Sequence, residues 1–269
     1  MAGNLSIGAA WAQAAAFVRR ERRLLAPVVL GLIMVPAVVA SMVQPPVPTG
    51  TSLGSGPWLV IALLMLVVMV VGQLAIVLLA NGWHGSVGQA IARAIRRLPT
   101  FLLDTLLIIG PLIVILSMIL AASGVTVGSD GRLSGANPGL VGSLMSLVVL
   151  AAVLFVAIRL MPLVAVIATG NDGPIASIRR TFVLTRGHFW RLFSFLLLMI
   201  IAFAVVGAAT VVVSDVLVTL LLGPPEPWSV SLLLLALIGG LFQTAFVTIY
   251  TAMLARIAAQ LEGAPTNGM

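Results

Sequence analysis

The chain has 269 residues, of which 61% are hydrophobic and only 8% are charged, so it is too apolar for a soluble globular domain. Disorder is excluded as well, because disordered segments combine low hydrophobicity with high charge. The composition indicates an integral membrane protein. All fourteen basic residues are Arg, seven carboxylates oppose them, and the net charge is +7.

The positive charge points to lipid rather than to nucleic acid. The Arg residues form short clusters between apolar runs, whereas nucleic-acid binding needs a soluble basic face with polar or aromatic readers. Anionic phospholipid headgroups are therefore the expected partner, and no nucleic acid is expected. Cysteine is absent, which excludes disulfides, thiolate nucleophiles and Cys-ligated metals.

Six apolar stretches are long enough to cross a membrane, for which a helix needs roughly 20 residues. They cover residues 24–43, 58–80, 102–122, 140–168, 192–213 and 229–254. The fifth can continue past Asp215 to residue 222. Inside lipid the backbone must pair its own amides, so these stretches are expected to be helices. A cleaved signal peptide ending near Ala40 is the less favoured interpretation of the first stretch.

The connections between these stretches alternate in character. Segments 44–57, 123–139 and 223–228 are rich in Pro, Gly and Ser, and Arg132 is their single basic residue. Arg159 lies inside the fourth stretch, and the other twelve Arg residues lie in the remaining connections and near the termini. The positive-inside rule predicts that the Arg-bearing segments and both termini face the cytoplasm of a bacterial inner membrane.

The segments before the first, third and fifth stretches share a pattern of apolar residues at helical spacing with Arg beside them. The apolar positions are Ile7, Trp11, Ala15 and Val18, then Val87, Ile91, Ile95 and Leu98, then Ile175, Ile178, Phe182 and Phe189. This pattern predicts three repeats, 1–81, 82–169 and 170–263, followed by a flexible tail, 264–269. The expected fold is one all-α, polytopic membrane helix bundle with six transmembrane helices in three hairpins, each preceded by an amphipathic interfacial helix. Chance similarity of Arg-rich cytoplasmic segments is the alternative.

The interfacial segments supply the residues expected to meet lipid. The headgroup contacts are expected from Arg96, Arg97, Arg179, Arg180, Arg186 and Arg191, and the aromatic anchors are Trp83, Phe189 and Trp190.

Polar residues inside the membrane are costly and are therefore candidates for function. Arg159 either binds a lipid phosphate or anionic substrate, or it snorkels to the interface beside a break at Pro162 or pairs with Asp104. Gln73 and Gln243 are expected to join helices, with a transport path as the alternative. Asp215 is interpreted as an interfacial residue.

The sequence offers little material for catalysis. His84 and His188 stand next to Trp in cytoplasmic segments, and Asp172 is the one carboxylate near enough to complete a metal or catalytic site, so both His residues are interpreted as interfacial. Gly-rich phosphate loops, nucleophile elbows and zincin motifs do not occur. No catalytic residue, metal or cofactor is expected.

One stretch carries a family resemblance. The sequence Arg159-Leu160-Met161-Pro162, the run from Asn171 to Phe182 and the run from Leu184 to Leu192 resemble the membrane domain found beside some glycerophosphoryl diester phosphodiesterases, and stand-alone bacterial six-helix proteins. Tyr250, Arg256 and Glu262-Gly263 are similar to the family's C-terminal end. The resemblance implies a six-helix membrane fold and a lipid- or envelope-related role. It does not imply phosphodiesterase activity, which in the fused relatives resides in a soluble barrel without counterpart in this sequence.

The leading functional hypothesis is a non-enzymatic inner-membrane protein that associates with anionic phospholipid and takes part in lipid handling or membrane organisation. The alternative is a transporter or permease subunit for an amphiphile. A third class, an intramembrane lipid enzyme, would need Arg159, Asp104 and a histidine in one cluster. Partners beyond phospholipid would be a second copy of the chain or another membrane protein.

Overall fold

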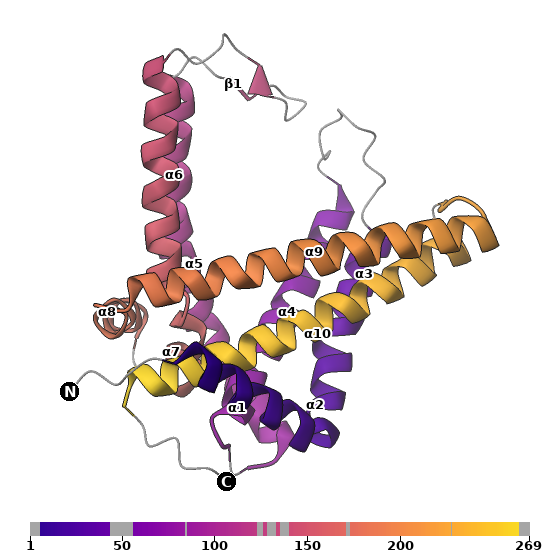
Figure 1. Cartoon of the computed structure of the whole chain (residues 1–269), viewed down its shortest axis with the longest axis horizontal. Helices are drawn as coiled ribbons and strands as arrows, with labels where there is room; N and C mark the ends of the chain where they lie inside the picture. The colour runs from indigo at the N-terminus through magenta and orange to yellow at the C-terminus, as the bar shows by residue number, and fades with distance from the viewer. Residues whose placement is uncertain are drawn as a thin grey trace.

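The computed structural model describes residues 6–43, 56–83, 85–122, 126–127, 133–134, 140–170, 173–226 and 228–263, and these are largely helical (Figure 1). The helices are α1 (Ile7–Arg20), α2 (Arg22–Val29), the π-helix η1 (Leu30–Met34), α3 (Val35–Val43), α4 (Pro57–Ala80), α5 (Val87–Ala122), α6 (Leu140–Leu160), α7 (Leu163–Thr169), α8 (Pro174–Leu184), α9 (Phe189–Leu222) and α10 (Val230–Leu261). Two short strands, β1 (Thr126–Val127) and β2 (Leu133–Ser134), pair antiparallel. The predicted all-α class is confirmed.

Six helical segments are long and apolar enough to cross a membrane, which confirms the predicted number. They are Arg22–Val43, Trp58–Ala80, Val87–Ile115, Leu147–Thr169, Phe189–Leu222 and Val230–Leu261. The second agrees with the prediction at both ends. The fifth runs through Asp215 to Leu222, because an exposed Asp does not interrupt a helix in the way that Pro does. The chain is therefore a multi-pass α-helical membrane protein.

Proline residues interrupt two of the predicted spans. Pro36 has no N–H, so the preceding turn widens into η1, and the Val35 N–H reaches the carbonyl of Leu30, five residues back. The stretch predicted as one helix over 140–168 is two helices, because α6 ends at Leu160 and α7 begins after Pro162. The break turns α7 toward α4, α5 and α8, which it packs against.

The three predicted interfacial helices differ in form. α1 and α8 are separate helices, whereas the segment before the third span is the first part of the continuous helix α5. The N-cap Ser86 explains this start: its Oγ accepts from the Gln89 N–H at 3.2 Å, and the Gln89 side chain accepts from the Ser86 N–H at 3.1 Å. The threefold repeat itself stays a prediction, and the tail 264–269 lies outside the described residues.

The most buried residues of α1 and α8 differ from those that define their predicted apolar sides. α1 buries Ala10, Ala14 and Phe17, and it packs on α10. α8 buries a stripe of hydroxyl residues, Ser177, Thr181 and Thr185, each of which donates to the carbonyl four residues earlier. Trp11 and Ile175, expected to share the apolar faces, are exposed. α8 thus packs through hydroxyl side chains and α1 through two Ala residues and Phe17, while Trp11 and Ile175 lie outside.

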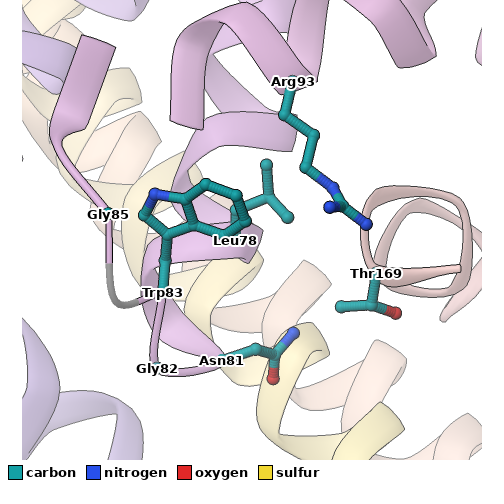
Figure 2. A pocket seen from close by; sticks show the side chains of 7 residues that line it. All are labelled: Leu78, Asn81, Gly82, Trp83, Gly85, Arg93 and Thr169. Carbon is teal, nitrogen blue, oxygen red and sulfur yellow. The ribbon is translucent and has the colours of Figure 1, made fainter. Parts of the chain in front are cut away.

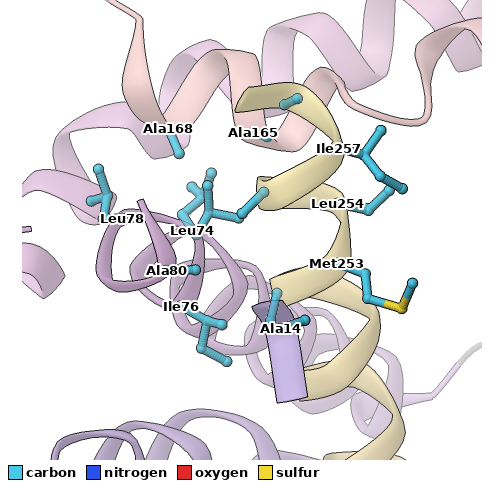
Figure 3. Close-up of a cluster of buried hydrophobic side chains, with 14 of the residues drawn as sticks. Ala14, Leu74, Ile76, Leu78, Ala80, Ala165, Ala168, Met253, Leu254 and Ile257 are labelled. Atoms are coloured by element: carbon cyan, nitrogen blue, oxygen red, sulfur yellow. The ribbon is translucent and has the colours of Figure 1, made fainter. Parts of the chain in front are cut away.

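The hydrophobic core gathers at one end of the molecule, which we call the packed end: α1, α2, α7, the starts of α5 and α9, and the final turns of α4, α6 and α10. Figure 3 shows its centre, where Leu74 and Leu78 of α4 meet α7 and the end of α10. Away from it, the α5–α6 pair and the α9–α10 pair diverge (Figure 1). Their outer parts expose many large apolar side chains, which lipid would cover in a membrane.

Helices α9 and α10 form a hairpin joined by aromatic rings. Phe195, Tyr250, Phe246 and Phe203 follow one another with centroid distances of 6.1, 6.3 and 4.8 Å. Spacings of four residues on α10 and eight on α9 place these rings on the facing sides of the two helices. The aromatic series fixes the register of the hairpin and thereby the position of Glu262, just beyond α10.

Candidate functional site

The described Arg residues all lie on elements of the packed end or next to them. They are in α1, α2, the first turns of α5 and α9, the last turns of α6 and α10, α8 and the α8–α9 turn. Arg132 lies outside the described residues. The packed end is thus both the best-packed part of the protein and its positively charged part.

Helix α8 presents a mixed basic and apolar outer face. Arg179 and Arg186 are exposed there, and neither has a hydrogen bond or ion pair within the described part of the chain. Ile175 and Val183, on the same side of the helix, are 74% and 66% exposed. Guanidinium groups beside exposed aliphatic side chains are typical of a helix at the headgroup level of a bilayer.

Arg180 has a different role from its neighbour. Its Nη2 lies 2.7 Å from Oε1 of Glu262, an ion pair that links α8 to the end of α10. The headgroup contact predicted for Arg180 therefore competes with a protein partner. Both side chains are partly exposed, so the pair contributes modestly, about 0.2–1 kcal/mol.

The remaining predicted headgroup residues fall into two groups, those with and those without interactions inside the described part of the protein. Arg96 is exposed and makes no hydrogen bond or ion pair among the described residues. Arg97 and Arg191 interact with other groups of the chain. Sequence reasoning treated all six Arg residues alike, because nothing in their spacing shows which have protein partners.

The predicted aromatic anchors occupy three different environments. Trp190 is 75% exposed at the start of α9 and can enter the interface. Phe189 packs inward, with its ring 5.3 Å from that of Phe155 on α6. Trp83 is half-buried in the α4–α5 turn, where its Nε1 donates to the Ser86 carbonyl at 3.3 Å.

Arg159 does not pair with Asp104. Its Nη1 donates to the carbonyl of Phe182 on α8 at 3.3 Å, and its guanidinium carbon lies 5.2 Å from the centre of the Phe155 ring. Its Nε is buried without a partner. The residue thus joins the end of α6 to α8, beside the break at Pro162.

Asp104 is fully buried in α5, and neither of its carboxylate oxygens has a hydrogen-bond partner among the described residues. The two Gln residues differ: Gln73 of α4 is half-buried, whereas Gln243 of α10 is exposed. That each joins helices stays a prediction. Arg159, Asp104 and a histidine do not form one hydrogen-bonded cluster in the described residues.

The structure also reveals a pocket that the sequence did not predict. It lies between the end of α4, the start of α5 and the end of α7, and has a volume of about 330 Å³. Its lining residues, shown in Figure 2, are Leu78, Asn81, Gly82, Trp83, Gly85, Arg93 and Thr169. Arg93 appeared in the sequence as one member of a basic cluster. The sequence feature that could have indicated this pocket is Ser-x-x-Gln, a capping box that fixes the start of α5 beside Trp83.

The histidines provide no metal site in the described residues. His188 caps α9 and has a buried Nδ1 without a partner, while His84 and Asp172 lie outside the described part of the chain. No group of three or more His, Cys, Asp or Glu side chains suited to a metal occurs among the residues described.

Comparison with known proteins gives no assignment. No protein-family model matches the chain, and no match is found among curated proteins or solved structures. The resemblance to the membrane domain of glycerophosphoryl diester phosphodiesterases therefore stays a prediction. What the fold defines is the class, a six-span α-helical membrane protein with a basic packed end.

Proposed function

We propose that this protein is a non-enzymatic, lipid-associated protein of a bacterial inner membrane, with both termini in the cytoplasm, that binds anionic phospholipid at its packed end. The proposal rests chiefly on the outer face of α8. There Arg179 and Arg186 have no protein partner among the described residues, and Ile175 and Val183 are exposed beside them. Trp190, at the start of α9, is exposed as well.

The physical reason is that lipid satisfies both kinds of side chain at once. A guanidinium group near an anionic membrane surface contributes about 1 kcal/mol, and the phosphate accepts hydrogen bonds from it in a fork geometry. The aliphatic side chains and Trp190 then lie in the boundary between headgroups and acyl chains. A soluble partner would leave the apolar residues only partly covered.

The test is retention of anionic lipid by the purified full chain in native mass spectrometry. We expect Arg179→Gln together with Arg186→Gln to lower the affinity for phosphatidylglycerol roughly thirtyfold, because two headgroup contacts of about 1 kcal/mol each are lost. Phosphatidylcholine, which carries no net charge, should be retained equally by the original and the substituted protein.

Two control substitutions distinguish an effect of lost positive charge from an effect of impaired folding. Replacing the same two residues with Lys keeps the charge and should preserve most of the retention. Arg180→Gln breaks the pair with Glu262 and should lower stability slightly while leaving most lipid binding intact. Undiminished phosphatidylglycerol retention in the Arg179, Arg186 double variant would contradict the proposal.

A further inference from the structure

We propose that the pocket between α4, α5 and α7 binds a phosphate group, with Arg93 as its principal ligand. This inference deepens the proposed association with lipid, since a phospholipid headgroup and free inorganic phosphate present the same chemistry. The site is distinct from the outer face of α8, because its lining residues come from α4, α5, α7 and the α4–α5 turn.

Arg93 lies against the Trp83 ring and has no anionic partner among the described residues. Its guanidinium carbon lies 5.6 Å from the centre of the Trp83 ring, and its buried Nε has no hydrogen-bond partner. No ion pair or hydrogen bond of Arg93 occurs within the described part of the chain. A partly buried guanidinium usually donates to a carboxylate, a phosphate or a carbonyl, because unused donors away from water are costly.

The surroundings of Arg93 favour an anion. Among the described residues that line the pocket, Arg93 is the one ionisable group and none is a carboxylate. The Asn81 side chain faces the same space from the end of α4, and its amide can supply a second donor (Figure 2). Thr169 donates its hydroxyl to the Ala165 carbonyl at 2.8 Å, so it is available as an acceptor for a protonated phosphate or for water.

The pocket is also held in shape before any ligand enters. The Trp83 ring is fixed by the hydrogen bond from its Nε1 to Ser86, and the capping box of Ser86 and Gln89 fixes the helix that carries Arg93. Gly85 is required here, because a Cβ at this position would lie 2.4 Å from Gln89 Oε1 and 2.6 Å from Trp83 Nε1. A site formed in advance loses less entropy on binding than a mobile one.

The volume of about 330 Å³ lies at the lower end of the range for small-molecule sites. It suits a phosphate with the adjoining atoms of a headgroup, and Leu78 provides an apolar wall. Arg96, three residues along α5, adds positive charge nearby but does not line the pocket. This makes Arg96 the matched control for Arg93, on the same helix and with the same charge.

The experiment compares Arg93→Gln with Arg96→Gln in the full chain. One arm titrates inorganic phosphate against the detergent-purified protein, with sulfate-free chloride buffer at equal ionic strength as the blank, and follows the thermal unfolding midpoint. The other arm measures phosphatidylglycerol retention by native mass spectrometry. We expect Arg93→Gln to lower affinity at least tenfold in one of the arms. Arg96→Gln should change it less than twofold in the phosphate arm and, because Arg96 is itself a predicted headgroup contact, by no more than about fivefold in the lipid arm.

A loss confined to the lipid arm identifies a headgroup site, and a loss confined to the phosphate arm identifies a site for the free anion. Arg93→Lys should retain part of the binding, which controls for a folding defect. Equal behaviour of the Arg93 and Arg96 variants in both arms would overturn the proposal and leave Arg93 as a structural cation at the ends of α4 and α7. The proposed lipid role of α8 would then still stand or fall on its own double variant.

Discussion

Two residues of opposite charge in the membrane helices, Arg159 and Asp104, do not form an ion pair with each other. Arg159 and Asp104 both lie in predicted membrane helices and carry opposite charges, yet Arg159 instead donates to the Phe182 carbonyl on α8. The break at Pro162 accounts for part of this, because it ends α6 directly after Arg159 and brings α8 within reach. Arg159 is thus explained as a structural connection between helices.

Asp104 has no such explanation, and its replacement is informative. Because its two oxygens are buried without hydrogen-bond partners among the described residues, we expect Asp104→Asn to increase the free energy of unfolding by about 1–3 kcal/mol, since it removes an unpaired negative charge from the interior. The measurement is the thermal unfolding midpoint in detergent. Asp215→Asn, at an exposed position of α9, is the control and should leave the midpoint unchanged.

A lower midpoint for Asp104→Asn would show that the carboxylate has a stabilising partner in the membrane, such as a cation or a proton donor. That result would favour the alternative of a transport subunit, because unpaired intramembrane acids are typical of ion-coupled pathways.

At the scale of helices, close approach is decided by small residues at particular contacts. Gly239 and Gly240 are neighbours on α10, but a Cβ on Gly240 would lie 2.8 Å from Cγ2 of Val38 on α3, whereas a Cβ on Gly239 would meet nothing within 4 Å. Small residues at such crossings allow membrane helices to pack tightly. The sequence shows a Gly-Gly pair without indicating which member is at the contact.

These two glycines provide a matched pair of substitutions. We expect Gly240→Ala to destabilise the protein by about 1–3 kcal/mol, since Val38 is β-branched and cannot move aside easily. Gly239→Ala should stabilise it by about 0.5–1 kcal/mol, because Ala favours a helix more than Gly does. Denaturant unfolding in mixed micelles measures both. Equal changes in the two variants would exclude the α3–α10 contact.

The helices preceding the spans illustrate the limits of periodicity. The sequence located α1 and α8 as amphipathic helices with an apolar side, without indicating which of their residues pack against the rest of the protein. In a membrane protein an exposed apolar face costs nothing when lipid covers it, so packing can use Ala10, Ala14 or the hydroxyl stripe of α8 instead. Hydrophobic periodicity therefore identifies the helix but not its partner.

For the whole molecule, the distribution of Arg and the location of the core coincide. The Arg-bearing elements belong to the packed end or lie next to it, and the outer parts of the α5–α6 and α9–α10 pairs diverge from it (Figure 1). This arrangement is consistent with a membrane orientation in which the packed end lies at the anionic cytoplasmic surface.

The orientation is testable with topology reporters. We expect alkaline phosphatase fused after residue 50 to be active and the same fusion after residue 90 to be inactive, because only the first position is predicted to lie outside the cytoplasm. Green fluorescent protein at the same two positions should give the opposite pattern. Reporters at both positions giving the same result would contradict the predicted topology.

The sequence alone determined the class of this protein, its six spans and the segregation of Arg. Insertion into a bilayer depends on the length of each apolar segment and on the positive charge beside it, and both are local properties of the sequence. Only the tertiary structure decided that Arg180 pairs with Glu262 and that Asp104 has no hydrogen-bond partner among the described residues. It also decided that Trp83, Arg93 and Thr169 line one pocket. Arg180 and Glu262 are 82 positions apart, and Trp83 and Thr169 are 86 positions apart. These relations depend on how α4, α5, α7, α8 and α10 pack, which neither periodicity nor composition specifies.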